Sequence, residues 1–533
     1  NGKIVNLRQK EIKELTDAVL QLDVPLKDLK AEMTLPLYKA FGVDTDAGIV
    51  HQDEDFMTLI NRMEKPEKID FDLPEDLKAT LRPYQETGYK WLKGLDHYGF
   101  GGILADDMGL GKTLQVISFI AGSLGEGDTK PYLVICPSSV LYNWQKEFKQ
   151  FAPGIQTQLI TGTKSERSDC VNAAIAENIP VWITSYPLLQ RDEDLYGGLA
   201  FRTVILDEAQ SVKNATAKTT KAASALTANN KIALSGTPIE NALSELYTIF
   251  SIAQPGLFGT RTDFKKMEPA QIAKKVKPFI LRRLKADVLK DLPPKIESIS
   301  YIEMTEKQKT AYLSQLQLMR QETIAMLDAD TLNENRIKIL AGLTRLRQIC
   351  CDPALVMADY KGGSGKLDWL MEYLAESKEN GRRVVLFSQF TQMLAIIREK
   401  LDAAGEAYFY LDGQTPNQDR LSLTTRFNEG EKDLFLISLK AGGTGLNLTG
   451  GDTVILYDSW WNPAVESQAT DRVHRFGQKK VVQVIRMIAT GTIEERINEL
   501  QEQKREMIDS VIQAGGQSVT SLTKEELMQL LEI

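Results

Sequence analysis

The chain contains few of the residues that build thiol- and imidazole-based sites. It has three histidines and four cysteines among 533 residues, and the cysteines are Cys136, Cys170, Cys350 and Cys351. No two cysteines have C-x-x-C spacing, so the sequence indicates neither a disulfide framework nor a zinc ribbon. The small number of histidines likewise argues against metal clusters and imidazole-centred triads.

Long apolar runs and an excess of positive charge are also missing. Without a run of about 18 apolar residues or a signal peptide, we expect a protein of the cytoplasm, associated with the nucleoid, or of the nucleus if the source is eukaryotic; no membrane is expected as a partner. The 64 basic and 72 acidic residues give a net charge of −8, which argues against a uniformly basic protein. A locally basic groove remains compatible with nucleic acid, because charges are screened within about 10 Å.

The length predicts several domains. At about 150 residues per domain, 533 residues suggest three to four. The first residue is Asn1 rather than Met, so we expect a processed chain or an excised region. Residues 1–75 are charged, with apolar positions at helical spacing, and we expect a helical leader or the tail of an upstream domain.

Residues 76–291 are predicted to form a first α/β lobe. Short apolar runs alternate there with helical patterns, at 101–106, 132–137, 181–186, 203–208 and 231–236. Such alternation predicts a parallel sheet buried on both faces. From about 240 to 350 the pattern predicts helices and no strands, with insertions near 240–280 and 303–350 that we interpret as packing helices.

Residues 292–500 are predicted to form a second α/β lobe, after a linker at the Pro-Pro pair in 292–295. Its apolar runs lie at 383–388, 407–412, 433–438, 453–458 and 481–486. Residues 501–533 are expected to be C-terminal helices, the last one starting at a capping box of Thr523 and Glu526. The fold class is thus two α/β lobes with parallel sheets, and a cleft between such lobes favours a shared ligand.

The stretch ADDMGLGKT at 105–113 has the end of a phosphate-binding loop. In that pattern the backbone cradles phosphates, the lysine reaches the β- and γ-phosphates and the hydroxyl binds Mg²⁺. Lys112 and Thr113 fit, but Asp106 stands where the pattern has glycine. Gly109 and Gly111 still allow a close turn, so we expect Asp106 to hold the loop in shape.

The stretch TVILDEAQ at 203–210 supplies the context that a nucleotide site needs. An apolar strand ends there in Asp207 and Glu208. In phosphate-loop ATPases a strand-end aspartate holds Mg²⁺, and an adjacent carboxylate orients and deprotonates the attacking water.

Together these motifs resemble the Swi/Snf family of DNA-dependent ATPases in helicase superfamily 2. Further motifs in family order are LRPYQ (81–85), CPSSVLYNW (136–144), TSYPLL (184–189), LSGTPIEN (234–241), LRRLKADV (281–288), LFSQF (386–390), LKAGGTGLNL (439–448), DSWWNP (458–463) and QATDRVHRFGQ (468–478). The resemblance implies a P-loop NTPase fold with two RecA-like lobes, and ATP and Mg²⁺ as cofactors. Without a recognisable bromodomain, chromodomain or histone-tail reader, we expect a bacterial or archaeal member.

The resemblance also implies the residues of a nucleotide site. The expected catalytic residues are Lys112, Asp207, Glu208, Arg472 and Arg475, and the expected Mg²⁺ ligands are Thr113 and Asp207. Arg472 and Arg475 are three apart and would share a helix face, as two arginine fingers would need. The expected nucleotide-binding residues are Gln85, Asp106, Asp107, Met108, Gly109, Leu110, Gly111, Lys112 and Thr113.

Other residues are expected to contact DNA or to couple the lobes. The expected DNA contacts are Ser138, Ser139, Gln389, Lys440, Gly443, Thr444 and Trp461. The expected coupling residues are Gln210, Ser235, Gly236, Thr237 and Gln468. From the residues alone, the glycine-rich loop at 441–447 suits a nucleotide as well as a nucleic-acid backbone, the two serines suit an N-cap as well as a phosphate site, and Trp460 and Trp461 suit a core as well as base stacking.

Two positions depart from the family pattern. Gln210 replaces the usual histidine after Asp-Glu-Ala, which puts the coupling role of that imidazole in doubt, and Phe476 replaces the commoner isoleucine.

The expected function is ATP-driven translocation of a monomer along double-stranded DNA, acting on RNA polymerase or other DNA-bound proteins. The alternatives are a strand-separating or RNA-directed helicase and an ATP-gated binding clamp.

Overall fold

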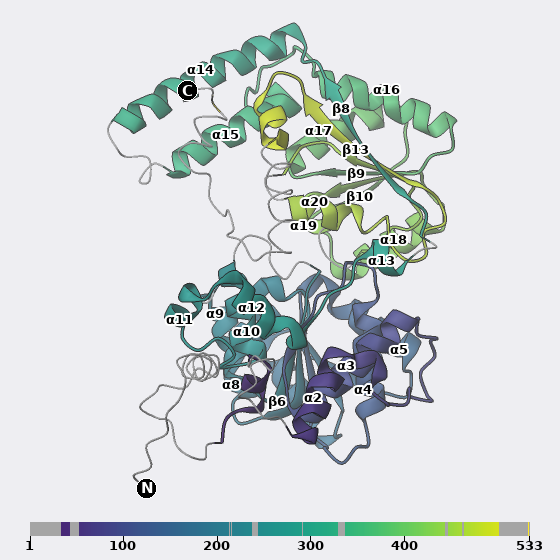
Figure 1. Ribbon diagram of the computed structural model, residues 1–533. Coiled ribbons are helices and arrows are strands. Elements are labelled where there is room, and N and C mark those ends of the chain that lie inside the picture. The colour runs from purple at the N-terminus through teal and green to yellow at the C-terminus, as the bar shows by residue number, and fades with distance from the viewer. Residues whose placement is uncertain are drawn as a thin grey trace. The chain divides into compact units, whose positions relative to one another are not determined.

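Two compact units make up the structure, one ending at Val288 and the other beginning at Leu289 (Figure 1). The computed structural model describes residues 34–42, 53–212, 214, 216–236, 243–289, 292–328, 336–442, 446–460, 463–499 and 531. Each unit is an α/β lobe built on a parallel sheet, which confirms the expected fold class. None of the helices in this described part combines the length and apolar character needed to cross a bilayer.

The first lobe has a seven-stranded sheet in the order β3-β4-β2-β5-β6-β1-β7. Its strands are β1 (Gly102–Leu104), β2 (Tyr132–Cys136), β3 (Thr157–Leu159), β4 (Val181–Ser185), β5 (Ala200–Leu206), β6 (Thr227–Leu234) and β7 (Ile280–Leu281). Every residue of β1, β2 and β4 is buried, as continuous apolar runs in a sheet covered on both faces require.

The register of this sheet brings the ends of several strands to one edge. Leu104 pairs with Leu234, and Leu206 pairs with Ala233. The strands are parallel, so the residues that follow β1, β5 and β6 emerge side by side. These residues begin the phosphate loop, the Asp207–Glu208 pair and the Ser235 segment.

Helices surround this sheet. They are η2 (Leu37–Gly42), α2 (Glu54–Glu64), η3 (Pro66–Lys68), α3 (Pro83–Tyr98), α4 (Lys112–Ser123), η4 (Ser138–Val140), α5 (Leu141–Phe151), α6 (Lys164–Ala176), α7 (Tyr186–Arg191), α8 (Glu193–Tyr196), η5 (Ala209–Val212), α9 (Lys218–Ala225), α10 (Leu243–Ala253), α11 (Arg261–Lys266), α12 (Pro269–Val276), η6 (Lys277–Phe279) and α13 (Lys285–Val288).

The second lobe has a six-stranded sheet in the order β10-β11-β9-β12-β13-β8. Its strands are β8 (Lys295–Ile302), β9 (Val384–Ser388), β10 (Phe409–Leu411), β11 (Leu434–Ser438), β12 (Thr453–Leu456) and β13 (Val482–Ala489). Its helices are α14 (Glu306–Asp328), α15 (Arg336–Cys351), η7 (Pro353–Leu355), α16 (Gly365–Glu379), α17 (Thr391–Ala403), α18 (Asn417–Asn428), α19 (Leu439–Gly442) and α20 (Pro463–Thr470).

All ten expected strands are present, but the prediction of no strands between 240 and 350 is wrong. β7 and β8 lie in that interval, and β8 pairs with β13 along its whole length. β8 was missed because it is a half-exposed edge strand without a continuous apolar run. The helical prediction holds for α14 and α15, whose apolar faces share one core cluster. The expected capping box of Thr523 and Glu526 lies outside the described residues.

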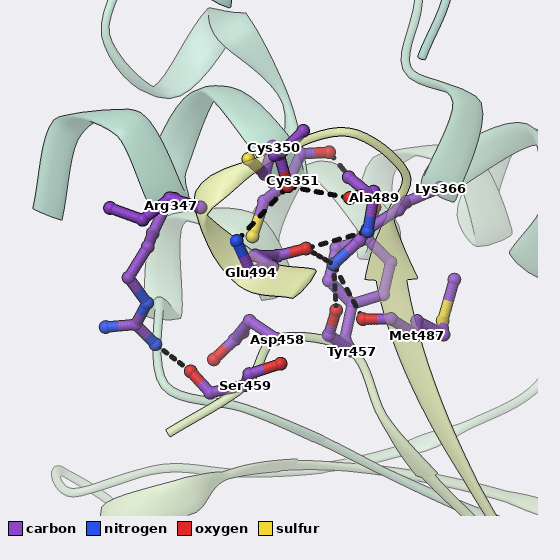
Figure 2. Close-up of polar contacts among 12 residues, drawn as sticks. Arg347, Cys350, Cys351, Lys366, Tyr457, Asp458, Ser459, Met487, Ala489 and Glu494 are labelled. Atoms are coloured by element: carbon purple, nitrogen blue, oxygen red, sulfur yellow. Dashed lines mark hydrogen bonds and ion pairs between the residues drawn. The ribbon is translucent and has the colours of Figure 1, made fainter. Parts of the chain in front are cut away.

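A buried ion pair ties the second lobe together (Figure 2). Lys366 Nζ lies 2.6 Å from Glu494 Oε2, and both side chains are buried. The same ammonium donates to the carbonyl oxygens of Tyr457 (3.0 Å) and Met487 (2.9 Å), so its three protons are all used. Burial opposes the charge on Lys366, but Glu494 and its neighbours hold the pKa of this lysine above its usual value. The pair therefore fastens α16 to the ends of β12 and β13.

We predict that Lys366→Met lowers the free energy of unfolding by about 3–5 kcal/mol, because it leaves the Glu494 carboxylate buried without a countercharge. The double variant Lys366→Met/Glu494→Leu should recover most of this loss. The exposed pair of Lys378 and Glu406 provides the control, and Lys378→Met should cost no more than about 1 kcal/mol. Urea denaturation of the purified variants measures all three, and equal losses for the two lysines would contradict the prediction.

Candidate active site

The phosphate loop connects β1 to α4 through two glycines in left-handed conformation. Gly109 has φ of 87° and Gly111 has φ of 77°, which side chains rarely adopt. Lys112 begins α4, and its Nζ donates to the carbonyl oxygen of Asp106 at 2.6 Å. Burial lowers the pKa of Lys112, while nearby carboxylates, led by Glu208, oppose this shift. The lysine thus lies at the centre of an acidic cluster.

Asp106 is fully buried and holds the loop through its carboxylate. Arg283 donates to it through Nε at 2.8 Å and through Nη2 at 2.5 Å, and Gln115 Nε2 donates at 3.1 Å. Arg283 also donates to Gln115 Oε1 at 2.8 Å, which closes a three-residue network. A Cβ on Gly88 would lie 1.8 Å from that same oxygen, so glycine at this position of α3 leaves room for the Gln115 amide as it stands in the network. The structure agrees with the shape-holding role expected for Asp106.

The other loop residues contact protein as well. Asp107 accepts a hydrogen bond from the Lys285 backbone N–H at 2.9 Å. Gln85 Nε2 donates to the carbonyl oxygen of Leu110 at 3.1 Å, and a Cβ on Gly111 would lie 2.6 Å from that nitrogen. Gln85 therefore packs directly against the phosphate loop. A nucleotide whose phosphates lie in this loop could have its adenine base next to Gln85. Its role in adenine recognition stays a prediction.

The Asp207–Glu208 pair follows β5 at the same edge of the sheet. Trp144 Nε1 donates to Asp207 Oδ2 at 2.8 Å, and the Glu208 backbone N–H donates to Oδ1 at 3.0 Å. Burial and the neighbouring Glu208 raise the pKa of Asp207 to about 7. A buried carboxylate of this kind would gain stability from a bound cation. Trp144 was not among the expected site residues, although it ends the CPSSVLYNW motif.

Gln210 links Glu208 to Ser235. Its Nε2 donates to Glu208 Oε2 at 2.8 Å, and its Oε1 accepts from Ser235 Oγ at 3.2 Å. Glu208 itself has φ of +50°, a left-handed conformation that is strained for a residue with a side chain. An amide can donate at one end and accept at the other, so Gln210 makes both contacts without a change of protonation.

The segment that carries Ser235 also packs against the phosphate loop. A Cβ on Gly236 would lie 2.8 Å from Met108 Cγ, so glycine allows this close approach. Three of the expected coupling residues, Gln210, Ser235 and Gly236, thus lie together in the first lobe. Thr237 lies outside the described residues.

Arg283 is the main site residue that the sequence did not single out. It follows β7, which pairs with β1, and the ladder continues where the Asp107 backbone N–H donates to the Arg283 carbonyl oxygen at 3.0 Å. The motif LRRLKADV was recognised, but nothing in it shows that its second arginine reaches Asp106. That contact depends on the pairing of β1 with β7, which the sequence pattern did not predict.

In the second lobe, the prediction that Arg472 and Arg475 share a helix face is wrong. α20 ends at Thr470, and both arginines lie in the turns that follow. Both arginines bond to residues 446–448: the Leu448 backbone N–H donates to the Arg472 carbonyl oxygen at 2.9 Å, and Arg475 Nη1 donates to the Leu446 carbonyl oxygen at 3.3 Å. Their expected role as arginine fingers stays a prediction.

Several expected DNA contacts follow strand ends. Ser138 and Ser139 form η4 after β2, and η4 leads into α5, as expected for a helix start. Gln389 directly follows β9, and Lys440 lies in α19 after β11. Gln468 is buried on α20. The side chain of Lys440, and the residues Gly443, Thr444 and Trp461, lie outside what the structure describes.

Trp460 packs partly buried against a core cluster of the second lobe. The core interpretation therefore holds for this tryptophan. Phe476, the second departure from the family pattern, is 57% exposed, so its ring is not part of the core.

Comparison with known protein families gives one matching family for a large part of each lobe. The SNF2-related domain matches residues 84–355, and the helicase conserved C-terminal domain matches residues 365–477. A third family, described as bacterial SNF2 helicase associated, matches residues 1–74.

Curated relatives match over most of the chain. YwqA of Bacillus subtilis, which its name classes provisionally as an ATP-dependent helicase/translocase, is 36% identical over 100% of this chain and 62% of its own length. An uncharacterized ATP-dependent helicase of Mycoplasma pneumoniae is 37% identical over 99% of this chain and 52% of its own. The human SWI/SNF-related matrix-associated actin-dependent regulator of chromatin subfamily A member 1 is 36% identical over 85% of this chain and 46% of its own. The chain thus spans 46% to 62% of the length of these relatives.

Among solved structures, the chain is similar to the Sulfolobus solfataricus SWI2/SNF2 ATPase core in complex with dsDNA. The sequence identity is 34%, the match covers 87% of this chain and 99% of that one, and the TM-score is 0.42.

We predict that Arg283→Met weakens nucleotide binding about tenfold, a loss of about 1.4 kcal/mol, because Asp106 is left buried without a countercharge and the loop loses the support of Arg283. The neighbouring Arg282 is exposed, so Arg282→Met is a matched control. Titration with a fluorescent ATP analogue measures the dissociation constants. Unchanged affinity in Arg283→Met would show that the loop keeps its shape without this ion pair.

Proposed function

This chain belongs to the SNF2-related family, and from that premise we propose that it hydrolyses ATP to move along double-stranded DNA and to remodel or displace protein bound there, without stable strand separation. The observation that carries the proposal is the single edge of the first sheet where Lys112, Asp207 and Glu208 meet. The phosphate loop, a buried strand-end carboxylate and a second carboxylate held by Gln210 are the parts that phosphoryl transfer to water needs.

Each part has a proposed role. Lys112 binds the β- and γ-phosphates, and Gln85, next to the loop, recognises the adenine base. Glu208 orients the attacking water and accepts its proton, and Gln210 keeps the Glu208 carboxylate in position. Arg472 and Arg475 neutralise the charge that develops on the transferred phosphoryl group.

The residues also fit Mg²⁺. Among the residues described, no three His, Cys, Asp or Glu side chains form a metal cage. Mg²⁺ typically uses one or two carboxylates together with waters and phosphates, so a single buried carboxylate suits it. We propose that Asp207 and the Thr113 hydroxyl hold the ion. When bound, Mg²⁺ supplies positive charge that stabilises the phosphate oxygens.

The DNA-directed part of the proposal rests on the loops at strand ends. In the first lobe, η4 offers Ser138 and Ser139 at the start of a helical segment, where backbone N–H groups favour phosphate. In the second lobe we propose Gln389, Lys440, Gly443, Thr444 and Trp461 as contacts. Gln210, Ser235, Gly236, Thr237 and Gln468 would pass the nucleotide state to these loops. An ATP-gated clamp needs no water-activating carboxylate, and the contact that holds Glu208 supports hydrolysis over that alternative.

We predict that Glu208→Gln lowers kcat for ATP hydrolysis by about 10²–10⁴, because the amide cannot accept the proton of the attacking water. ATP binding should persist, since Lys112 and the loop are unchanged. Glu177→Gln replaces an exposed glutamate of the same lobe and is the control. A coupled-enzyme assay measures turnover, and continued hydrolysis by Glu208→Gln would remove its assigned role.

We also predict that double-stranded DNA raises the ATPase rate of the wild-type protein more than single-stranded DNA or duplex RNA does. A protein that moves along B-form DNA should respond less to an RNA duplex, whose grooves have a different shape, or to a single strand, which lacks the duplex. The rates are compared at one low salt concentration, because phosphate contacts weaken steeply with salt. Stimulation chiefly by single strands would favour an unwinding helicase, and stimulation chiefly by RNA an RNA-directed enzyme.

A further inference from the structure

Arg347 is a buried cation on α15, a helix that the sequence pattern assigned to packing alone. Only 2% of its surface is exposed, although packing of α15 would be served equally well by an apolar residue. Burying a guanidinium is costly unless its donors are used. Figure 2 shows its guanidinium at the left, directed toward Ser459 and away from the Lys366–Glu494 pair.

The guanidinium reaches two loops at the carboxyl edge of the second sheet. Nη2 donates to the carbonyl oxygen of Ser459, in the loop after β12, and Nη1 donates to Gln389 Oε1 at 3.4 Å, in the loop after β9. The Arg347 guanidinium carbon also lies 5.8 Å from the centroid of the Phe390 ring. β9 and β12 are neighbouring strands, with Leu456 paired to Phe387. The loops that follow them therefore lie close together, and one planar guanidinium can donate to both.

Asp458 lies in the loop after β12 and connects this loop to the loop after β9. Its carboxylate accepts hydrogen bonds from the Gln389 backbone N–H, at 3.2 Å to each oxygen, and from the Ser388 hydroxyl. Burial raises the pKa of Asp458, and the charge of Arg347 is the first influence that opposes this rise. Arg347 therefore stabilises the ionised carboxylate that holds the β9 loop to the β12 loop.

The contact with Arg347 also orients the Gln389 side chain. Arginine has donors only, so the amide oxygen of Gln389 must face it. The amide nitrogen of Gln389 is buried and has no hydrogen-bond partner among the residues that the structure describes. In the described part of the chain, the hydrogen bond from Arg347 therefore holds the Gln389 side chain through its amide oxygen.

We propose that Arg347 is a positioning residue for the nucleic-acid loops of the second lobe. It sets Gln389 and the Ser459–Trp460 segment in the arrangement that grips a DNA backbone, and it does so from α15, outside those loops. This inference rests on the proposed function, because it takes these loops to be the DNA-contacting ones.

The test compares Arg347→Gln with Arg345→Gln. Arg345 lies two residues away on the same helix and is exposed, so it controls for the loss of one positive charge. For Arg347→Gln we expect the duplex DNA concentration that half-saturates ATPase stimulation to rise about tenfold, as the loss of a charge-assisted contact of about 1.4 kcal/mol would give. Affinity for a fluorescent ATP analogue should stay at the wild-type value, since the phosphate loop proposed to bind it lies in the first lobe, whereas Arg347 donates to Gln389 and Ser459 in the second. Arg345→Gln should match the wild type in both measurements.

Two further variants keep the proposal falsifiable. Arg347→Lys retains one donor but cannot bridge both loops, and we expect a rise of about threefold. Arg347→Gln/Gln389→Ala should be no weaker for DNA than Gln389→Ala alone if Arg347 acts through Gln389, and additive losses would overturn that route. Thermal melting checks folding; if Arg347→Gln does not fold, a wild-type value for Arg347→Lys overturns the proposal.

The outcomes separate the inference from the proposed function. A wild-type ATPase that duplex DNA does not stimulate contradicts the proposed function, and the inference falls with it. A stimulated wild type together with an Arg347→Gln variant that matches Arg345→Gln overturns the inference alone.

Discussion

The ion pair between Asp106 and Arg283 is the interaction on which the candidate active site depends. The common phosphate-loop pattern has a flexible glycine at the position of Asp106. Here the position carries a buried carboxylate that Arg283 fixes with two hydrogen bonds. Through Gln115 the ion pair also fixes the first turns of α4, and the absence of a side chain at Gly88 lets α3 approach this network. The phosphate loop can therefore keep one shape, which is what a site that binds phosphate through its backbone requires.

The second lobe uses similar physics at the matching edge of its own sheet. Arg347 and Asp458 are both buried there, and between them they hold the loops that follow β9 and β12. In each lobe an arginine from outside the central strands supports loops at the carboxyl ends of those strands. Buried charges of this kind contribute little net stability compared with apolar packing, but they fix geometry because an unpaired partner is costly. The same reasoning applies to Lys366 and Glu494, which fasten α16 to the sheet.

Local patterns in the sequence were sufficient for the central strands and the phosphate loop. Apolar runs bounded by turn residues predicted the nine inner strands and the edge strand β10, because a buried strand leaves a continuous apolar signal. β8 left no such signal, since its side chains are half exposed at the sheet edge. Asp106 could be given a structural role from the sequence, but its partner could not be identified, because the two residues are 177 positions apart and meet only through the pairing of β1 with β7. Arg472 and Arg475 were expected on a helix because their spacing fits one, but α20 ends at Thr470. Both arginines bond instead to residues 446–448, a contact between distant segments that no local pattern reveals.

Displacement of a third strand from a DNA triplex is the assay that separates translocation from unwinding, because a protein that moves along a duplex removes the third strand without opening the duplex. We expect ATP-dependent release of the third strand by the wild-type protein, no release by Glu208→Gln, and an intact underlying duplex in both cases. Rapid ATP hydrolysis on duplex DNA without release of the third strand, or release accompanied by separation of the duplex strands, would contradict the proposed translocation.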